Sequence, residues 1–232
     1  MPMEPHYFHK NMTVYFTVNT LSEFLCFAIS LFCLYRDKDK AWKGFILFLM
    51  LTCITEIAGI YIRNELHKHN FMLYNIFLVV ECTVLNLFFY HLIKTNDSLK
   101  KLLVAWLVFF LIFYFYELYT LHFRAYVSTS STVMSVEIVL VSIYFYYRLL
   151  KEEKFRQLST YAPFWWVNGT ICFYFAGMAC NIFFKYLVQD VASSPGVTHS
   201  ARYVVFSILN VILYACWSYS FICRYFQRTS IP

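Results

Sequence analysis

The chain has 232 residues, of which 60% are hydrophobic and only 14% are charged, and its mean hydropathy is +0.56. This composition excludes an ordinary soluble domain and predicts an integral membrane protein that crosses the bilayer several times. The formal net charge of +6 gives no reason to expect nucleic-acid binding, because no soluble domain is present to carry a basic face. Anionic lipid headgroups explain this charge more simply.

Apolar runs, taken in chain order, predict seven helices that span the membrane. Six of the runs approach or exceed the roughly 20 residues needed to cross the hydrocarbon core, and the fifth, with 16 residues, is the shortest. We therefore expect an all-α bundle of seven transmembrane helices that forms a single domain over residues 1–232. The predicted helices cover approximately residues 15–35, 43–62, 71–92, 102–121, 132–147, 163–184 and 201–225.

Lysine and arginine residues are divided unequally between the two sides of this predicted bundle. The connections after the first, third and fifth helices, together with the C-terminal segment, contain 13 of them, whereas the other side contains 6. Cytoplasmic loops of membrane proteins carry the excess of Lys and Arg. We therefore expect the C-terminus to be cytoplasmic and the N-terminus to lie outside.

Each of the first five predicted helices carries one glutamate as its only acidic residue. These residues are Glu23, Glu56, Glu81, Glu117 and Glu137. An acidic side chain at the centre of a spanning helix costs about 2.5 to 3.5 kcal/mol, so it normally faces a bundle interior or a wet cavity. The predicted orientation places Glu81 at or just outside the midplane and the other four in the outer half. The sequence therefore predicts a polar site inside the outer half of the bundle.

Tyrosine and asparagine side chains share helical faces with some of these glutamates. Tyr74 precedes Glu81 by seven residues and Tyr114 precedes Glu117 by three, spacings that place both side chains of a pair on one face. We expect these faces, with a polar stripe on the last helix, to line a shared and partly hydrated cavity that opens outward. The predicted binding residues are Glu23, Glu56, Glu81, Glu117, Glu137, Tyr74, Asn75, Tyr114, Asn168, Asn210 and Tyr214.

The predicted spans contain no lysine or arginine near their centres to pair with these carboxylates. Either the glutamates are protonated hydrogen-bond donors, or they hold a cation or a cationic ligand. Any single glutamate could instead form a hydrogen bond across helices that serves packing alone, worth about 0.6 kcal/mol. His67 and His69, in a predicted external loop, would chelate a metal ion only if that loop is extended, since residues two apart share no helical face.

Motifs of common enzymes and cofactor sites are missing from the sequence. The chain contains no GxSxG, HExxH, Walker or GxGxxG pattern. The last predicted helix has no lysine for a retinal Schiff base, and we expect no cofactor. All eight cysteines fall in apolar runs, which predicts small buried side chains and no disulfide framework. These absences disfavour an enzyme but leave open an intramembrane acid/base reaction by paired glutamates.

A resemblance to a known group rests on two stretches of the sequence. They are TEIAGIYIRNELHKHNFMLYNIFLVVEC at residues 55–82 and APFWWVNGTICFYFAGMACNIFF at residues 162–184. Together they resemble functionally uncharacterised bacterial seven-helix membrane proteins that look like the membrane portions of sensors. The resemblance covers most of the chain through Glu56, Tyr74, Asn75, Glu81, Phe164, Trp165 and Gly169. It implies a sensor-like membrane module, in a bacterial inner membrane, and offers no catalytic residues.

We therefore expect a receptor-like or sensor-like protein that binds a small ligand, a proton or a cation in the outward cavity. Glu81 would be the central switch. Because the sequence ends at Pro232, soon after the last predicted helix, we expect a separate cytoplasmic partner to receive any signal. One alternative is a cation or proton transporter, or a homo-oligomeric channel, that uses the same glutamates. A second alternative is an intramembrane enzyme that modifies lipids.

Overall fold

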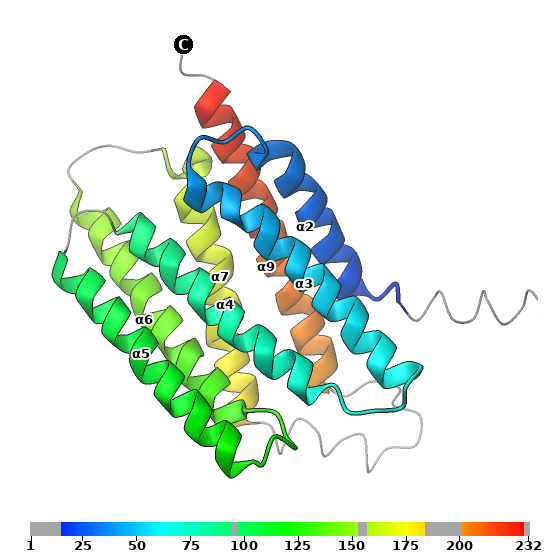
Figure 1. Cartoon of the computed structure of the whole chain (residues 1–232). Helices are drawn as coiled ribbons and strands as arrows, with labels where there is room; N and C mark the ends of the chain where they lie inside the picture. The colour runs from blue at the N-terminus through cyan, green and yellow to red at the C-terminus, as the bar shows by residue number, and fades with distance from the viewer. Residues whose placement is uncertain (1–14, 94–96, 153–156, 184–200, 230–232) are drawn as a thin grey trace, which may run out of the picture.

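The computed structural model describes residues 15–93, 97–152, 157–183 and 201–229 and shows an all-helical bundle (Figure 1). Seven α-helices and no strands occur within these ranges, which confirms the all-α part of the predicted fold class; seven membrane crossings and the orientation of the termini stay predictions. The α-helices are α2 (Val18–Leu34), α3 (Lys40–Asn64), α4 (Phe71–Leu92), α5 (Asp97–Thr120), α6 (Ser128–Lys151), α7 (Ala162–Ile182) and α9 (Ala201–Thr229). A short 3-10 helix, η1 (Leu158–Thr160), precedes α7.

Five of these helices are long and apolar enough to cross a membrane. They are α3, α4, α6, Ser98–Thr120 of α5 and Tyr203–Thr229 of α9. Helix α2 has only 17 residues, and α7, although 21 residues long, is made more polar by Asn168 and Asn181. The five long helices identify a multi-pass membrane protein.

The predicted helix at 71–92 has the same bounds in the structure, but other predicted bounds require correction. The predicted helix 132–147 extends to Ser128–Lys151, because hydropathy detects the apolar segment and misses polar helical turns at its two ends. The predicted helix 15–35 begins only at Val18, where the Thr17 side chain accepts a hydrogen bond from the Thr20 N–H at 3.2 Å and caps the helix.

The remaining predicted bounds differ for similar reasons. The predicted helix 43–62 begins at Lys40, directly after the N-cap residue Asp39, and ends at Asn64. Polar residues likewise lengthen the predicted helices 102–121 and 201–225 at one end. The predicted helix 163–184 is Ala162–Ile182, and residue 184 lies outside the described residues.

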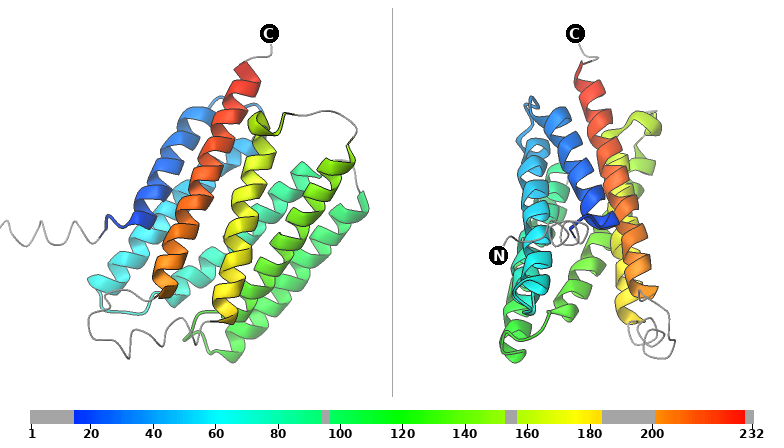
Figure 2. Two further views of the ribbon diagram at one scale, coloured as in Figure 1. Left: turned by 180° about the vertical axis from the view of Figure 1, so that it is seen from behind. Right: turned by 90° about the vertical axis from the view of Figure 1, so that its right-hand side faces the viewer.

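Six of the helices form a closed ring. Helix α2 packs against α3, α3 against α4, α4 against α6, α6 against α7, α7 against α9, and α9 back against α2. Helix α5 packs on the outside of α4 and α6. Figure 2 shows α9 between α2 and α7. Closing the ring brings residues from opposite ends of the sequence to one central axis.

Aromatic side chains fill the middle of this ring. Phe45 lies at its centre, with ring centroids 4.7 Å from Phe88, 5.6 Å from Trp166 and 5.5 Å from Trp217. All four side chains are nearly inaccessible to solvent. Such edge-to-face contacts add to the stabilisation from apolar burial. The packed cluster leaves the two ends of the axis as the places where cavities form.

Small residues support close helix packing around the aromatic cluster. A Cβ atom on Gly169 would lie 2.6 Å from the Cβ atom of Cys216, so a glycine at this position allows α7 and α9 to approach closely. None of the eight cysteines forms a disulfide, and six are buried, as expected for small apolar side chains. Cys172 is exposed and Cys216 is half-buried, so these two depart from that prediction.

Candidate functional site

A cavity of about 520 Å³ occupies one end of the ring axis, and we call it the glutamate cavity. It reaches from Asn70 and Tyr126, in the connections before α4 and α6, inward to Thr52 and Leu78. Its walls come from the six helices of the ring. The size is typical of small-molecule sites, which measure about 300–1,000 Å³.

Three carboxylates from three different helices line this cavity: Glu23 of α2, Glu56 of α3 and Glu81 of α4. Glu23 is 6% exposed, and its Oε2 atom has no hydrogen-bond partner among the described residues. The Tyr74 hydroxyl donates to Oε2 of Glu56 at 3.0 Å. The Tyr174 hydroxyl donates to Oε1 of Glu81 at 2.6 Å. Two of the three carboxylates are therefore oriented by tyrosines of neighbouring helices.

The described lining of the glutamate cavity contains no lysine, arginine or histidine. Its polar side chains other than the glutamates are hydroxyl and amide groups, which carry no charge. A carboxylate removed from bulk water needs a proton, a cation or several hydrogen-bond donors. The cavity can therefore attract protons or positively charged groups and repel anions.

The structure brings together six of the eleven residues that the sequence nominated for binding. Those that line the cavity are Glu23, Glu56, Glu81, Tyr74, Asn210 and Tyr214. The other five, Asn75, Tyr114, Glu117, Glu137 and Asn168, lie outside its described lining. Helical spacing correctly relates neighbours on one helix, but it does not tell which faces of different helices meet.

Asn75 and Tyr114 hold the connection between α5 and α6 against α4. The Asn75 side-chain amide donates to the Ala125 carbonyl at 3.0 Å, and its carbonyl accepts from the Val127 N–H at 3.1 Å. The Tyr114 hydroxyl donates to the backbone carbonyl of Asn75 at 3.0 Å. These bonds satisfy buried polar groups of the connection, so both residues have structural contacts of their own.

Glu117 and Glu137 also have polar partners away from the cavity. Glu117 accepts hydrogen bonds from the backbone N–H groups of Thr129 and Ser130, at 3.0 and 2.7 Å, at the N-terminus of α6. An anionic side chain there complements the helix dipole and the unpaired N–H groups. Glu137 accepts a hydrogen bond from Asn86 at 3.2 Å. Asn168 is half-buried on α7.

The histidines considered for metal binding lie in the exposed connection between α3 and α4. His67 has a positive φ of 50°, and the His69 ring stacks on Phe71 with centroids 5.1 Å apart. Among the described residues, no three His, Cys, Asp or Glu side chains are grouped as metal ligands. These two histidines would thus need ligands from outside the described residues to complete a metal site.

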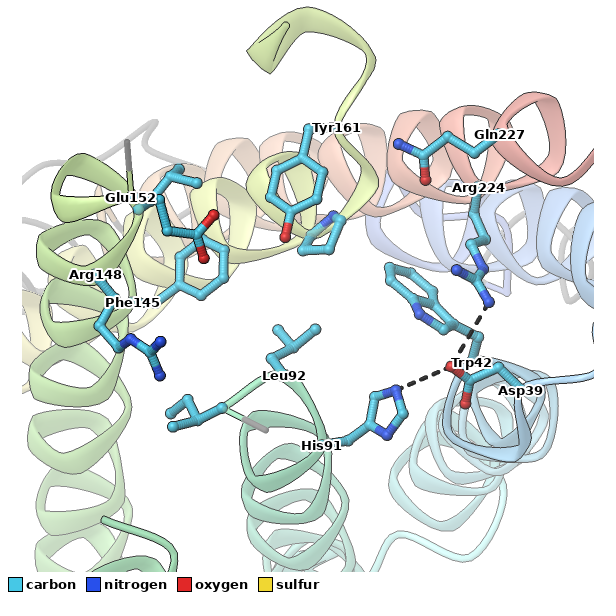
Figure 3. A pocket seen from close by; sticks show the side chains of 13 residues that line it. Asp39, Trp42, His91, Leu92, Phe145, Arg148, Glu152, Tyr161, Arg224 and Gln227 are labelled. Carbon is cyan, nitrogen blue, oxygen red and sulfur yellow. Dashed lines mark hydrogen bonds and ion pairs between the residues drawn. The ribbon is translucent and has the colours of Figure 1, made fainter. Parts of the chain in front are cut away.

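A second cavity, of about 320 Å³, lies at the opposite end of the ring axis, and we call it the Arg224 pocket (Figure 3). Figure 3 shows Arg224 of α9 and His91 of α4 directed toward Asp39, which precedes α3. Arg148 of α6 and Tyr161, before α7, line the same pocket. Unlike the glutamate cavity, this pocket combines acidic and basic side chains.

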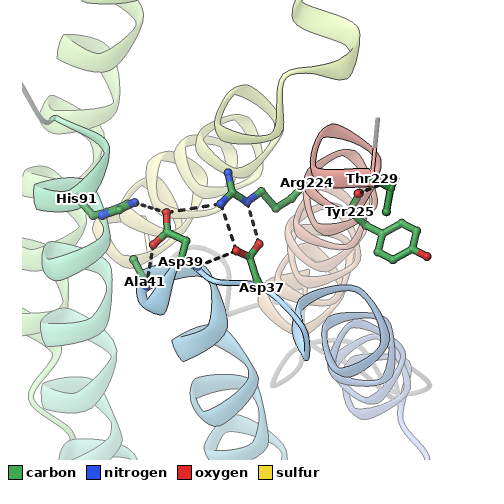
Figure 4. Close-up of polar contacts among 7 residues, drawn as sticks. All are labelled: Asp37, Asp39, Ala41, His91, Arg224, Tyr225 and Thr229. Carbon is green, nitrogen blue, oxygen red and sulfur yellow. Dashed lines mark hydrogen bonds and ion pairs between the residues drawn. The ribbon is translucent and has the colours of Figure 1, made fainter. Parts of the chain in front are cut away.

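Arginine–carboxylate ion pairs and a histidine–carboxylate hydrogen bond connect three segments at the Arg224 pocket (Figure 4). Arg224 donates to both carboxylate oxygens of Asp37, at 2.9 and 3.2 Å, and lies 3.6 Å from Asp39. His91 Nε2 lies 3.0 Å from the Asp39 carboxylate. Burial alone would raise the pKa of Asp37, but hydrogen bonds from Arg224 and from the Asp39 N–H, together with the charges of Arg224 and Arg228, outweigh burial and lower this pKa below its ordinary value. The cluster ties the α2–α3 connection to α4 and α9.

Sequence reasoning missed this charged cluster. In the sequence, the basic residues of this end, Arg224 among them, indicated only membrane orientation, and Asp37 and Asp39 were assigned no role. The spacing of Asp37 and Asp39, two acidic residues within a basic connection that also holds Arg36, Lys38 and Lys40, was the available signal. Nothing local to that connection identifies an arginine 187 residues away as the partner.

A chain of contacting aromatic rings joins the glutamate cavity to the Arg224 pocket. It begins at Tyr214, which lines the glutamate cavity, and ends at Trp42, which lines the Arg224 pocket and lies 5.5 Å beneath the Arg224 guanidinium. Successive centroids are 6.0, 5.7, 4.4 and 4.9 Å apart. The chain consists of Tyr214, Trp217, Trp166, Phe88 and Trp42. A movement of Tyr214 can therefore be transmitted through contacting side chains to Arg224 and its ion pairs.

No protein-family model, no curated protein and no solved structure matches this chain.

Proposed function

We propose that this protein is a receptor-like or sensor-like membrane protein that binds a small ligand or cation in the glutamate cavity. The observation that carries the proposal is the convergence of Glu23, Glu56 and Glu81 on one cavity without a basic residue in its described lining. Placing carboxylates inside a membrane bundle costs free energy. Ligand binding can explain why three of them are kept on one cavity, whereas packing alone does not.

All seven helices cross the membrane in this proposal, with the N-terminus outside and the C-terminus in the cytoplasm. Helices α2 and α7 belong to the same ring as the long apolar helices and pack on either side of α9, which supports their lying at the same depth. Described basic residues at the Arg224 end support its assignment to the cytoplasm. They are Arg36, Lys38, Lys40, Lys43, Arg148, Lys151, Arg224 and Arg228.

Signal transfer would use the hydrogen bonds that join the helices around the cavity. A ligand that contacts Glu81 competes with the bond from Tyr174, which connects α4 to α7. A shift of α7 or α9 moves the aromatic chain and changes the balance among the ion pairs of Asp37, Asp39 and Arg224. A separate cytoplasmic protein would then recognise the altered basic surface at the Arg224 end.

Thermal unfolding in lipid nanodiscs tests binding in the glutamate cavity. We expect the midpoint of the parent protein to shift with pH between about 4 and 9, a range that brackets perturbed carboxyl groups, or with one class of cation. Glu81→Gln should lose that shift, whereas Glu137→Gln, a matched change of a buried glutamate outside the cavity lining, should keep it. Identical, unshifted midpoints for all three proteins would contradict the proposal.

Amide hydrogen exchange tests the coupling to the opposite end. A compound that shifts the midpoint should also change exchange at residues 35–39, the connection that Arg224 holds. If the exchange rates of these amides are the same with and without the bound compound, the protein binds a ligand but lacks the proposed signalling step.

A cation or proton transporter is the second candidate, because two cavities lie at opposite ends of one ring axis. The tightly packed rings of Phe45, Trp166 and Trp217 between them speak against an open path. Proteoliposome flux of protons or monovalent cations, abolished by Glu81→Gln, would favour the transporter over the receptor.

A further inference from the structure

We propose that the ligand of the glutamate cavity is a small organic ammonium ion, held by the charge of Glu23 and Glu81 and by surrounding aromatic faces. This inference rests on the proposed function and specifies the chemical class of its ligand. It draws on the charge, the aromatic lining and the size of the cavity.

The charge of the cavity lining selects a cation. Ionised Glu23, Glu56 and Glu81 would give the cavity three negative charges, and its described lining offers no positive side chain to offset them. Tyrosine hydroxyls satisfy one oxygen of Glu56 and one of Glu81. Glu23 also has a tyrosine, Tyr214, beside its carboxyl group, but it is 6% exposed and its buried Oε2 atom accepts no hydrogen bond from a described residue. An unsatisfied buried carboxylate is costly, and a cation beside it removes that cost.

Aromatic side chains provide the second element of the site. Phe77, Phe173, Tyr174 and Tyr214 contribute rings to the cavity lining from α4, α7 and α9. An alkylammonium group is attracted to the electron-rich face of an aromatic ring, by about 0.5 to 2 kcal/mol for each favourable contact. Carboxylates combined with several rings are the usual surroundings of a bound organic ammonium ion.

The size of the cavity favours an organic cation over a bare metal ion. A Ca²⁺ ion requires about six to eight oxygen ligands at 2.3–2.6 Å, whereas the described residues contain no group of three potential His, Cys, Asp or Glu ligands. A volume of about 520 Å³ lies in the range of small-molecule pockets, about 300–1,000 Å³. The organic part of an ammonium ligand would fill this space and contact the rings.

Binding of matched compounds to the full chain in lipid nanodiscs tests the proposal. The probes are tetramethylammonium, choline and 2-phenylethylammonium. Neutral analogues of choline and 2-phenylethylammonium are 3,3-dimethylbutan-1-ol and 2-phenylethanol, and 3-phenylpropanoate supplies the anion. We expect at least one ammonium probe to bind and to raise the thermal midpoint. The neutral analogue of choline or of 2-phenylethylammonium should bind at least about tenfold more weakly than the ammonium ion itself, the ratio that corresponds to 1.4 kcal/mol.

Variants of the lining separate charge from aromatic contact. Glu23→Gln and Glu81→Gln should each weaken ammonium binding by about 10- to 100-fold, as expected when a charged hydrogen-bond partner is lost. Phe173→Leu should weaken it by about 2- to 30-fold, the range of one cation–π contact. Glu137→Gln removes a carboxylate outside the cavity lining and should leave affinity unchanged.

The possible outcomes distinguish the ligand class from the proposed function. Tighter binding of a neutral analogue or of 3-phenylpropanoate, reduced by cavity substitutions, would overturn the ammonium assignment and leave a ligand-binding receptor. Binding of Na⁺, K⁺ or Ca²⁺ alone would overturn the organic part of the assignment in the same way. Absence of binding by every probe at millimolar concentration, with midpoints indifferent to the cavity substitutions, would overturn both.

Discussion

Acidic side chains have basic partners at one end of the ring axis and none among the described lining residues at the other. At the Arg224 pocket, Asp37 and Asp39 are paired with Arg224 and His91. In the glutamate cavity, three carboxylates share a lining whose described residues include no lysine, arginine or histidine. A paired buried charge holds a structure together, because removal of one partner leaves the other unsatisfied. Carboxylates without a basic partner cost stability, and three of them on one cavity are a cost that ligand binding can offset.

The largest expected effect follows from breaking the paired end. Arg224→Ala should leave Asp37, whose side chain is only 2% exposed, buried without its partner, and lower the free energy of unfolding by about 3 kcal/mol. Reversible unfolding by a denaturing detergent in mixed micelles measures the change. Arg148→Ala removes the same charge from the same pocket, where Arg148 forms no ion pair with a described residue, and should cost much less.

A double substitution checks the cause of that loss. Arg224→Met combined with Asp37→Leu removes both charges and should recover a large part of the stability, because no unpaired charge remains. Equal losses in the single and double variants would show that Arg224 acts through its contact with Trp42 and not through its ion pair.

Glu117 lies near the glutamate-cavity end, yet it should behave like the paired aspartates. Glu117→Gln keeps one acceptor oxygen but loses a hydrogen bond to the first turn of α6 and the favourable charge at that helix end, at an expected cost of about 1 kcal/mol. Glu65→Gln, in the exposed connection after α3, is the matched control and should fall within about 0.5 kcal/mol of the parent. Ligand response should survive both changes, and its loss in Glu117→Gln alone would place Glu117 in the binding machinery.

Glu23 should respond in the opposite direction. Without ligand, Glu23→Gln should leave the protein equally stable or more stable, by up to about 1 kcal/mol, because a carboxylate that has no basic partner in the described lining is replaced by a neutral group of the same shape. Asp37→Asn makes an equivalent replacement at the paired end and should destabilise the protein. A destabilised Glu23→Gln variant would indicate that Glu23 serves packing and would remove the contrast between the two ends.

The smallest expected effect is the acid sensitivity of the paired end. The pKa of Asp37 is lowered in the folded protein, so its stabilising contribution is fully present above the unfolded pKa, about 3.9. It is lost as the pH falls through the lower folded value. Unfolding measured between about pH 3 and 7 should therefore show a decline below about pH 4 that is reduced in Asp37→Asn. If stability falls just as steeply below about pH 4 in Asp37→Asn, other carboxyl groups cause the decline.

Much of the fold was predictable because the signal for a membrane helix is local. The run at residues 71–92 contains the whole apolar segment and agrees with α4 in both bounds. Other bounds shifted where a polar side chain caps a helix, as Thr17 and Asp39 do, because capping depends on hydrogen bonds that hydropathy does not measure.

The candidate site was predictable only in part. Glu23, Glu56 and Glu81 were identifiable as costly residues within apolar runs, and they line one cavity. Glu117 looked equivalent in sequence, but its carboxylate caps α6, since the α5–α6 connection brings that helix end beside it. The pairing of Tyr174 with Glu81 was not predicted, because the two residues are 93 positions apart and lie on different helices.

The sequence by itself determined that this is an all-helical membrane protein with carboxylates inside its helices. It could do so because each helix satisfies its own backbone hydrogen bonds in lipid, so length and hydropathy are sufficient. Only the tertiary structure decided which carboxylates share a cavity and which have structural partners. That outcome depends on how each helix is rotated against its neighbours in the ring, and rotation is set by contacts between distant segments such as Arg224 with Asp37.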